Sequence, residues 1–187
     1  MEETPSEFFL LFSSPLITGC NVSTSPYTSR SDSTMSSNHP EQTFPHLHNA
    51  VIGNLNNILE PRPYFKRGSR EILSNFTKKY STFVMANFTC ENSQCSKAGW
   101  RSGKVTILIR GYENNGYHAT IFNQRCERCK KFGSLELDES AYIDRVCYRL
   151  KKWAGISMEM RSSREPKKMP PHKNDLCEGC RKGFCEG

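Results

Sequence analysis

Three pairs of closely spaced cysteines constrain this chain more than any other feature of its sequence. The pairs are Cys90 and Cys95 in CENSQC, Cys126 and Cys129 in CERC, and Cys177 and Cys180 in CEGC. Cysteines two residues apart bridge each other poorly in structural disulfides, but their thiolates can hold one tetrahedral ion from a tight turn. The chain has nine cysteines, and an odd number argues against a complete set of disulfides. The pattern therefore predicts metal sites, with zinc as the metal.

The cysteine pairs can be grouped into two four-ligand sets. The first set is Cys90, Cys95, Cys126 and Cys129, and the second is His172, Cys177, Cys180 and Cys185. Each set matches the composition of a closed structural zinc site. Such a site contributes roughly 10 kcal/mol or more to folding. We therefore expect two structural zinc ions, and we expect the second ion to replace a hydrophobic core in the short C-terminal segment.

The segments between the pairs have the patterns of strands and one helix. β-branched and aromatic residues predict strands at 82–90, 104–112 and 117–126, and Asn115-Gly116 is a strong signal for a hairpin turn. The motif GSLELD predicts one more short strand, and a helix is expected from Glu139 to Ala154, with Asp138 as its N-cap and Gly155 at its end. These elements predict an α+β fold, a small zinc-ribbon-like antiparallel domain with one packed C-terminal helix.

The N-terminal part of the chain has a different composition. Residues 1–40 contain ten Ser and five Thr without apolar periodicity, which predicts a disordered tail. A zinc-binding domain is expected at 44–187, comprising a lead-in helix at 44–60, strands and helix at 82–155, and the zinc cluster at 172–185. Met35 is a second candidate for the start of translation.

Hydropathy indicates the cellular setting. The mean hydropathy is −0.65, and no run of residues is long and apolar enough to span a membrane. The apolar run near the N-terminus is short and has acidic residues where a signal peptide has basic ones. We therefore expect an intracellular protein of the cytoplasm, with the nucleus as the alternative.

The remaining cysteines and histidines are expected to have no functional role. Cys147 lies beside the apolar stripe of the 139–154 helix and is predicted to be a buried small apolar residue, while Cys20 lies in the predicted tail. His46, His48 and His118 have no partner at a ligand spacing. The basic side chains of the helix are predicted to lie mostly on its solvent face: Arg145, Arg149, Lys151 and Lys152.

Two long motifs resemble a known family. The segments NQRCERCKKFGSLELDESAYIDRVCYRLKKWAG and PPHKNDLCEGCRKGFC resemble the fungal 3CxxC-type zinc-finger family, which is related to the vertebrate receptor-transporting proteins. The resemblance extends from about Phe44 to Cys185, and FTCENSQCSKAGW fits the first cysteine motif with four residues between the cysteines in place of two. It implies zinc binding. For the animal relatives, it implies assistance to certain seven-helix receptors on their way to the cell surface.

Three classes of function are compatible with structural zinc sites to different degrees. The expected function is a protein-interaction module that assists the folding or trafficking of a client protein. The alternative is a module that binds RNA or single-stranded nucleic acid without sequence specificity, because the chain carries a net +12 after residue 60. A zinc enzyme needs an open coordination position. The closed sets therefore predict no enzyme, no catalytic residue and no small-molecule substrate.

Overall fold

A computed structural model describes residues 39–55, 57–158 and 171–185. Of the predicted tail at 1–40, only His39 and Pro40 fall within this range, so the prediction of disorder, Cys20 and Met35 lie outside the described residues. Most of the polar linker before the C-terminal cysteines also lies outside them.

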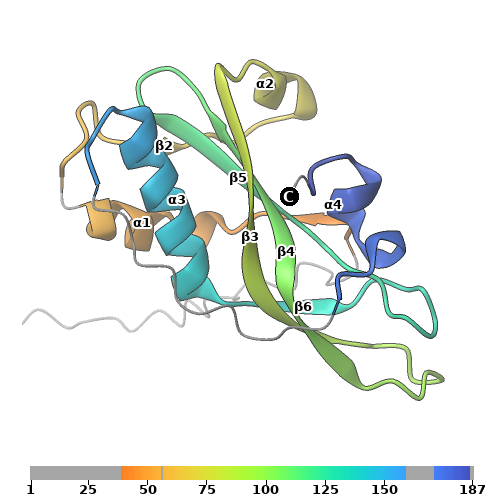
Figure 1. Cartoon of the computed structure of the whole chain (residues 1–187). Helices are drawn as coiled ribbons and strands as arrows, with labels where there is room; N and C mark the ends of the chain where they lie inside the picture. Colours follow the sequence, from red (N-terminus) through yellow and green to blue (C-terminus); the bar gives the residue numbers. More distant parts are fainter. Residues whose placement is uncertain (1–38, 56, 159–170, 186–187) are drawn as a thin grey trace, which may run out of the picture. The chain divides into compact units, whose positions relative to one another are not determined.

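The described residues form a six-stranded sheet (Figure 1). Its strands are β1 (Glu41–Gln42), β2 (Tyr64–Phe65), β3 (Lys78–Thr89), β4 (Gly99–Gly111), β5 (Gly116–Phe122) and β6 (Ser134–Leu137). The order across the sheet is β1-β5-β4-β3-β6, and all of these pairs are antiparallel. Strand β2 pairs with β5 in parallel, at the turn end of the β4–β5 hairpin.

Local sequence explains the central hairpin. Asn114 and Asn115 adopt positive φ angles of 52° and 59°, which asparagine tolerates better than most residues. The turn closes with a hydrogen bond from the Tyr112 amide to the Gly116 carbonyl. This turn sets the register of the hairpin, in which Ile109 pairs with Ala119. In this register the buried apolar residues of both strands lie on the same face of the sheet.

Two helices cover that apolar face. Helix α3 (Glu139–Trp153) begins at Asp138, whose carboxylate accepts a hydrogen bond of 2.9 Å from the Ala141 amide. Helix α1 (His48–Leu55) packs beside it after a short 3-10 helix, η1 (Pro45–Leu47) (Figure 1). The main hydrophobic core lies between these helices and the sheet.

The opposite face of the sheet is covered by the C-terminal segment. This segment contains η2 (Asn174–Leu176) and α4 (Glu178–Arg181), and α4 contacts β4 (Figure 1). Leu108 and Phe122, which point to this face, are each only 1% exposed. None of the described helices is both long and apolar enough to cross a membrane.

The predicted fold class is confirmed, and the differences concern short elements and one side chain. The lead-in helix is shorter than expected, ending at Leu55 rather than near Glu60. Strands β1 and β2 and helix α2 (Arg70–Ser74) were not predicted. Arg149 is buried and not on the solvent face, because its guanidinium lies 3.0 Å from the centre of the Tyr80 ring on β3.

Candidate metal centres

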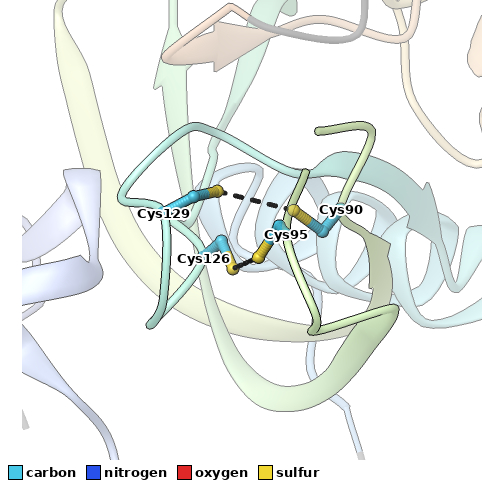
Figure 2. A group of neighbouring side chains, drawn as sticks. All are labelled: Cys90, Cys95, Cys126 and Cys129. Atoms are coloured by element: carbon cyan, nitrogen blue, oxygen red, sulfur yellow. Dashed lines mark hydrogen bonds between the residues drawn. The ribbon is translucent and has the colours of Figure 1, made fainter. Parts of the chain in front are cut away.

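The first predicted set forms one compact cluster at the end of the sheet. Cys90 follows β3 and Cys95 lies in the next loop, while Cys126 and Cys129 come from the turn after β5 (Figure 2). The four sulfur atoms lie within 4.8 Å of one another. The Cys90–Cys129 and Cys95–Cys126 sulfur pairs are 3.5 and 3.7 Å apart. Four Zn–S bonds require about 3.8 Å between sulfurs, so this cluster fits a tetrahedral zinc ion.

Backbone hydrogen bonds shape both loops of this cluster. In the second loop the Lys130 amide donates to the Cys126 carbonyl at 2.9 Å, and Lys130 adopts a positive φ of 59°. In the first loop the Cys95 amide donates to the Asn92 carbonyl at 2.8 Å. These turns aim two thiols from each loop at a common centre, which explains how a pair separated by four residues matches one separated by two.

The second predicted set also comes together. Its four ligand atoms lie within 4.8 Å of one another: those of His172, Cys177, Cys180 and Cys185. His172 Nε2 is 3.1 Å from the Cys180 sulfur and 3.9 Å from the Cys185 sulfur. These distances lie on either side of the about 3.6 Å expected between nitrogen and sulfur ligands of one zinc ion. The structure thus brings together all eight residues in the two expected groups.

The C-terminal cluster is anchored to the sheet, which differs from the expectation that metal alone would replace a core. Cys177 is 2% exposed, and its backbone forms a bridge with Gln124. Thr106 on β4 lies against the segment, with its hydroxyl 2.6 Å from the Cys185 sulfur. A Cβ atom on Gly179 would lie only 2.6 Å from the Thr106 Cβ, so glycine permits this close approach.

Two thiols of the first cluster have pKa values shifted in opposite directions. The backbone N–H of Lys131 is the main cause that lowers the pKa of Cys129 to about 6. The pKa of Cys90 is raised to about 12: the backbone N–H of Asn92 acts to lower it, but burial and hydrogen bonds with three neighbouring thiols outweigh that effect. Thiolates are the form that binds zinc, so metal binding must release protons here.

The C-terminal cluster is more strongly affected by burial. Burial raises the pKa of the Cys180 thiol to about 12, and burial also raises the pKa of Cys177. Burial, together with the charge of Lys104, lowers the pKa of His172 below its usual value. His172 is therefore neutral at pH 7, which is the form of imidazole that binds zinc.

Residues 83–183 match the model of the Zn_ribbon_3CxxC family, described as a zinc-binding domain, and this range is more than half of the chain. The chain belongs to this family. The matched range includes seven of the eight clustered residues, and Cys185 lies two residues beyond it. Zinc as the bound metal, expected from the sequence, is thereby confirmed. Comparisons with curated proteins and with solved structures give no match.

The remaining histidines and Cys147 lie outside both clusters. The Cys147 sulfur donates to the Val51 carbonyl at 3.4 Å within the main core. His48 hydrogen-bonds the Tyr117 hydroxyl, and His118 hydrogen-bonds the Lys66 carbonyl. His46 lies 3.7 Å from Glu139.

An ion-pair bridge connects the two clusters. Glu127, between the two cysteines of the CERC turn, pairs with Lys97 at 3.0 Å and also with Lys173, the neighbour of His172. The hydrogen bond from Lys173, with that from Lys97, lowers the pKa of Glu127 to about 2. The sequence contained no periodic signal for this bridge, since its three members are far apart along the chain.

Proposed function

We propose that this chain is a protein-binding module, and that it binds an acidic segment of a client protein in a groove between the two metal clusters. The groove has a volume of about 490 Å³. It is bordered by residues adjacent to both clusters, including Lys97 and Glu127 on one side and His172 and Lys173 on the other. The two zinc ions would hold the sides of this groove in place and act structurally, since each has a closed set of four protein ligands.

The observation that carries this proposal is the charge of the groove. Five basic side chains line it: Lys97, Arg101, Lys104, Arg125 and Lys173. Glu127 is the one acidic residue in this lining, and it is shared by two lysines. Arg101 is exposed and has no carboxylate partner among the residues that the structure describes. The groove is therefore complementary to negative charge.

The groove also offers aromatic surface. Trp100 is half-buried and stacks on Phe88, with ring centres 5.0 Å apart and planes 6° from parallel. Its indole N–H donates to the buried Gln124 side chain at 3.2 Å, which fixes the ring. Phe83 lies under the Lys104 ammonium at 4.7 Å. Trp and Arg are enriched among the hot-spot residues that contribute most of the binding energy in protein interfaces. We therefore expect an apolar residue of the acidic segment to contact Trp100.

Single-stranded nucleic acid is the second candidate, since cations beside aromatic rings also bind bases and phosphates. One observation favours the protein partner: Arg149 is buried on Tyr80, so it is not part of a basic helix face. The resemblance to the fungal family and to receptor-transporting proteins also supports client handling, in a reducing intracellular compartment where thiolates remain available to zinc.

Selection from a random displayed peptide library tests the proposal. We expect enrichment of peptides in which Asp and Glu flank an aromatic or aliphatic residue. Affinity for a selected peptide should fall about tenfold in Arg101→Glu, because a charge contact becomes a repulsion. The matched control is Arg62→Glu, an exposed arginine outside the groove, which should change affinity less than about twofold.

A parallel titration with a 12-nucleotide single-stranded RNA separates the two candidates. Weak RNA binding, with peptide binding sensitive to Arg101, supports the protein-binding function. The opposite result would be micromolar RNA binding that Arg101→Glu abolishes, together with no enriched class of peptides. That result would show that the groove binds nucleic acid and not a protein segment.

A further inference from the structure

A second hollow, separate from the groove, lies on the same face of the sheet. It has a volume of about 720 Å³, in the range of small-molecule sites. Its walls come from four regions: β1 with the residues just after it, the segment around α2, strands β4 and β5, and the C-terminal segment after α4. The C-terminal segment thus separates this hollow from the groove between the metal clusters.

The floor of the hollow is polar, although it is formed by the middle of a sheet. Arg110 of β4 and His118 of β5 are paired directly across the two strands, and Thr120 is the next residue on the same face. His118 and Thr120 are 6% and 3% exposed. Arg110 beside them is half-buried. Burial of polar side chains costs free energy unless they are hydrogen-bonded, so the partners of these three residues matter.

The polar floor presents both donors and an acceptor. Arg110 uses one guanidinium nitrogen to donate to the Thr120 hydroxyl at 3.4 Å, and a guanidinium has further N–H donors. His118 lies with Nδ1 2.8 Å from the Lys66 carbonyl, so Nδ1 carries the proton of the neutral ring. Burial and the charge of Arg110 lower the pKa of His118, which favours this neutral form. Its Nε2 is then an acceptor, and it has no hydrogen-bond partner among the described residues.

The charge of the hollow is positive. Lys182 is paired with Glu41, the acidic residue in this lining. Arg70 and Arg110 also line the hollow, and neither has a carboxylate partner in the described part of the chain. Arginine side chains without such partners are well suited to bind a phosphate or carboxylate group.

The walls of the hollow are aromatic. Phe122 and Phe184 stack on each other with ring centres 5.2 Å apart, and Phe76 lies 5.8 Å from the Arg110 guanidinium. Phe76 is 36% exposed although it borders the hollow. A ligand with an apolar body would cover this ring while its anionic group contacts the arginines.

We propose that this hollow binds a small organic anion, with a phosphate or carboxylate held by Arg110 and Arg70 and an apolar body against Phe76. A hydroxyl or N–H group of the ligand donates to His118 Nε2. The site does not depend on the proposed groove, because the two share no lining residue.

Titration of the zinc-loaded full chain, followed by NMR at constant ionic strength and pH 7.5, tests the site. The probes are phenyl phosphate, benzoate and inorganic phosphate. We expect saturable shifts at Arg110, His118 and Thr120. Phenyl phosphate should bind about fivefold more tightly than inorganic phosphate, because its ring buries apolar surface. Whichever of phenyl phosphate and benzoate binds more tightly identifies the anionic group.

Two variants and a matched control complete the test. Arg110→Gln should weaken phenyl phosphate binding about tenfold or more, because a charged hydrogen bond is lost. Arg70 is exposed, so Arg70→Gln should weaken binding severalfold without disturbing the fold. Arg67→Gln removes the same charge three residues away, outside the hollow, and should leave affinity unchanged.

Two results would overturn the proposal: shifts that do not saturate, or equal losses in Arg70→Gln and Arg67→Gln. Either result means that the anions respond only to the overall positive charge. Zinc content of each variant, measured in parallel, must remain two ions per chain for the comparison to be valid.

Discussion

The two metal clusters stabilise the protein in different ways. The four-cysteine cluster joins loops that are far apart in sequence, since Cys90 and Cys129 are separated by 39 positions. The C-terminal cluster closes a segment of only 13 positions between His172 and Cys185, and this segment rests on a finished sheet. The first cluster therefore fixes the ends of strands, and the second fixes a cover on one face.

This difference predicts an unequal sensitivity to the loss of each ion. Without the first ion, the ends of β3 and β5 lose their connection, and β6 pairs only with the part of β3 next to Cys90. Without the second ion, the sheet and the core beneath α1 and α3 remain connected through their own contacts. Four substitutions can therefore test whether loss of the first ion destabilises the protein more than loss of the second.

Cys126→Ser should have the largest effect. The first cluster loses a ligand that is fully buried, so we expect loss of one zinc ion and a decrease of about 5 kcal/mol or more in the free energy of unfolding. Elemental analysis and thermal unfolding measure both quantities. The control is Cys147→Ser in the core, which should keep two zinc ions and cost about 1–3 kcal/mol. Release of zinc by Cys147→Ser would show that the ligand assignment is wrong.

Cys180→Ser should also release one zinc ion, but with a local consequence. We expect amide hydrogen exchange to increase by orders of magnitude in residues 172–185, while strands β4 and β5 stay protected, because the cover opens and the sheet does not. Exchange followed by NMR at each amide makes this visible. Equal loss of protection throughout the sheet would contradict the distinction between the two clusters.

Gly179→Ala tests the contact between the C-terminal segment and Thr106. The added methyl group would overlap the Thr106 side chain, so we expect a loss of about 1–3 kcal/mol and weaker zinc binding at the second cluster alone. Gly183→Ala is the control. Gly183 has open space around it but a φ of +74°, so this substitution should cost about 1 kcal/mol through backbone strain and not through a steric overlap. Zinc release to a chelator, measured for both variants, should be faster only for Gly179→Ala.

Glu127→Gln should have the smallest effect on stability, because the Glu127 ion pairs are partly exposed and screened by solvent. This substitution tests whether zinc binding at one cluster affects zinc binding at the other. In the wild type, removal of the second ion should speed release of the first, and in Glu127→Gln this acceleration should be smaller. Identical acceleration in the two proteins would exclude the bridge as the connection.

Much of the fold could be predicted because its signals are local. The Asn115-Gly116 turn, the Asp138 cap and the spacing of the cysteine pairs each depend on residues close in sequence, and each led to an observed element or cluster. Strands of two residues, such as β1 and β2, contain too few positions for any periodicity, so they could not be predicted.

The features that sequence reasoning missed depend on contacts between distant segments. Arg149 has the spacing of a solvent-exposed helix residue, yet the Tyr80 ring on another element buries it. Gly179 lies between the two cysteines of the CEGC turn, but the residue that requires a glycine there is Thr106 on β4, far away along the chain. The polar floor at Arg110 and His118 lies within strand sequences that otherwise predict an ordinary half-buried sheet.

Because the C-terminal segment lies over Leu108 and Phe122, we expect the solubility of this protein to depend on bound zinc. When zinc is scarce and the segment detaches, these two strand residues, now almost fully covered, become exposed to solvent together with Leu176. Exposed apolar strand surface promotes aggregation and recognition by chaperones. Removal of zinc should therefore cause this protein to aggregate before the sheet itself unfolds.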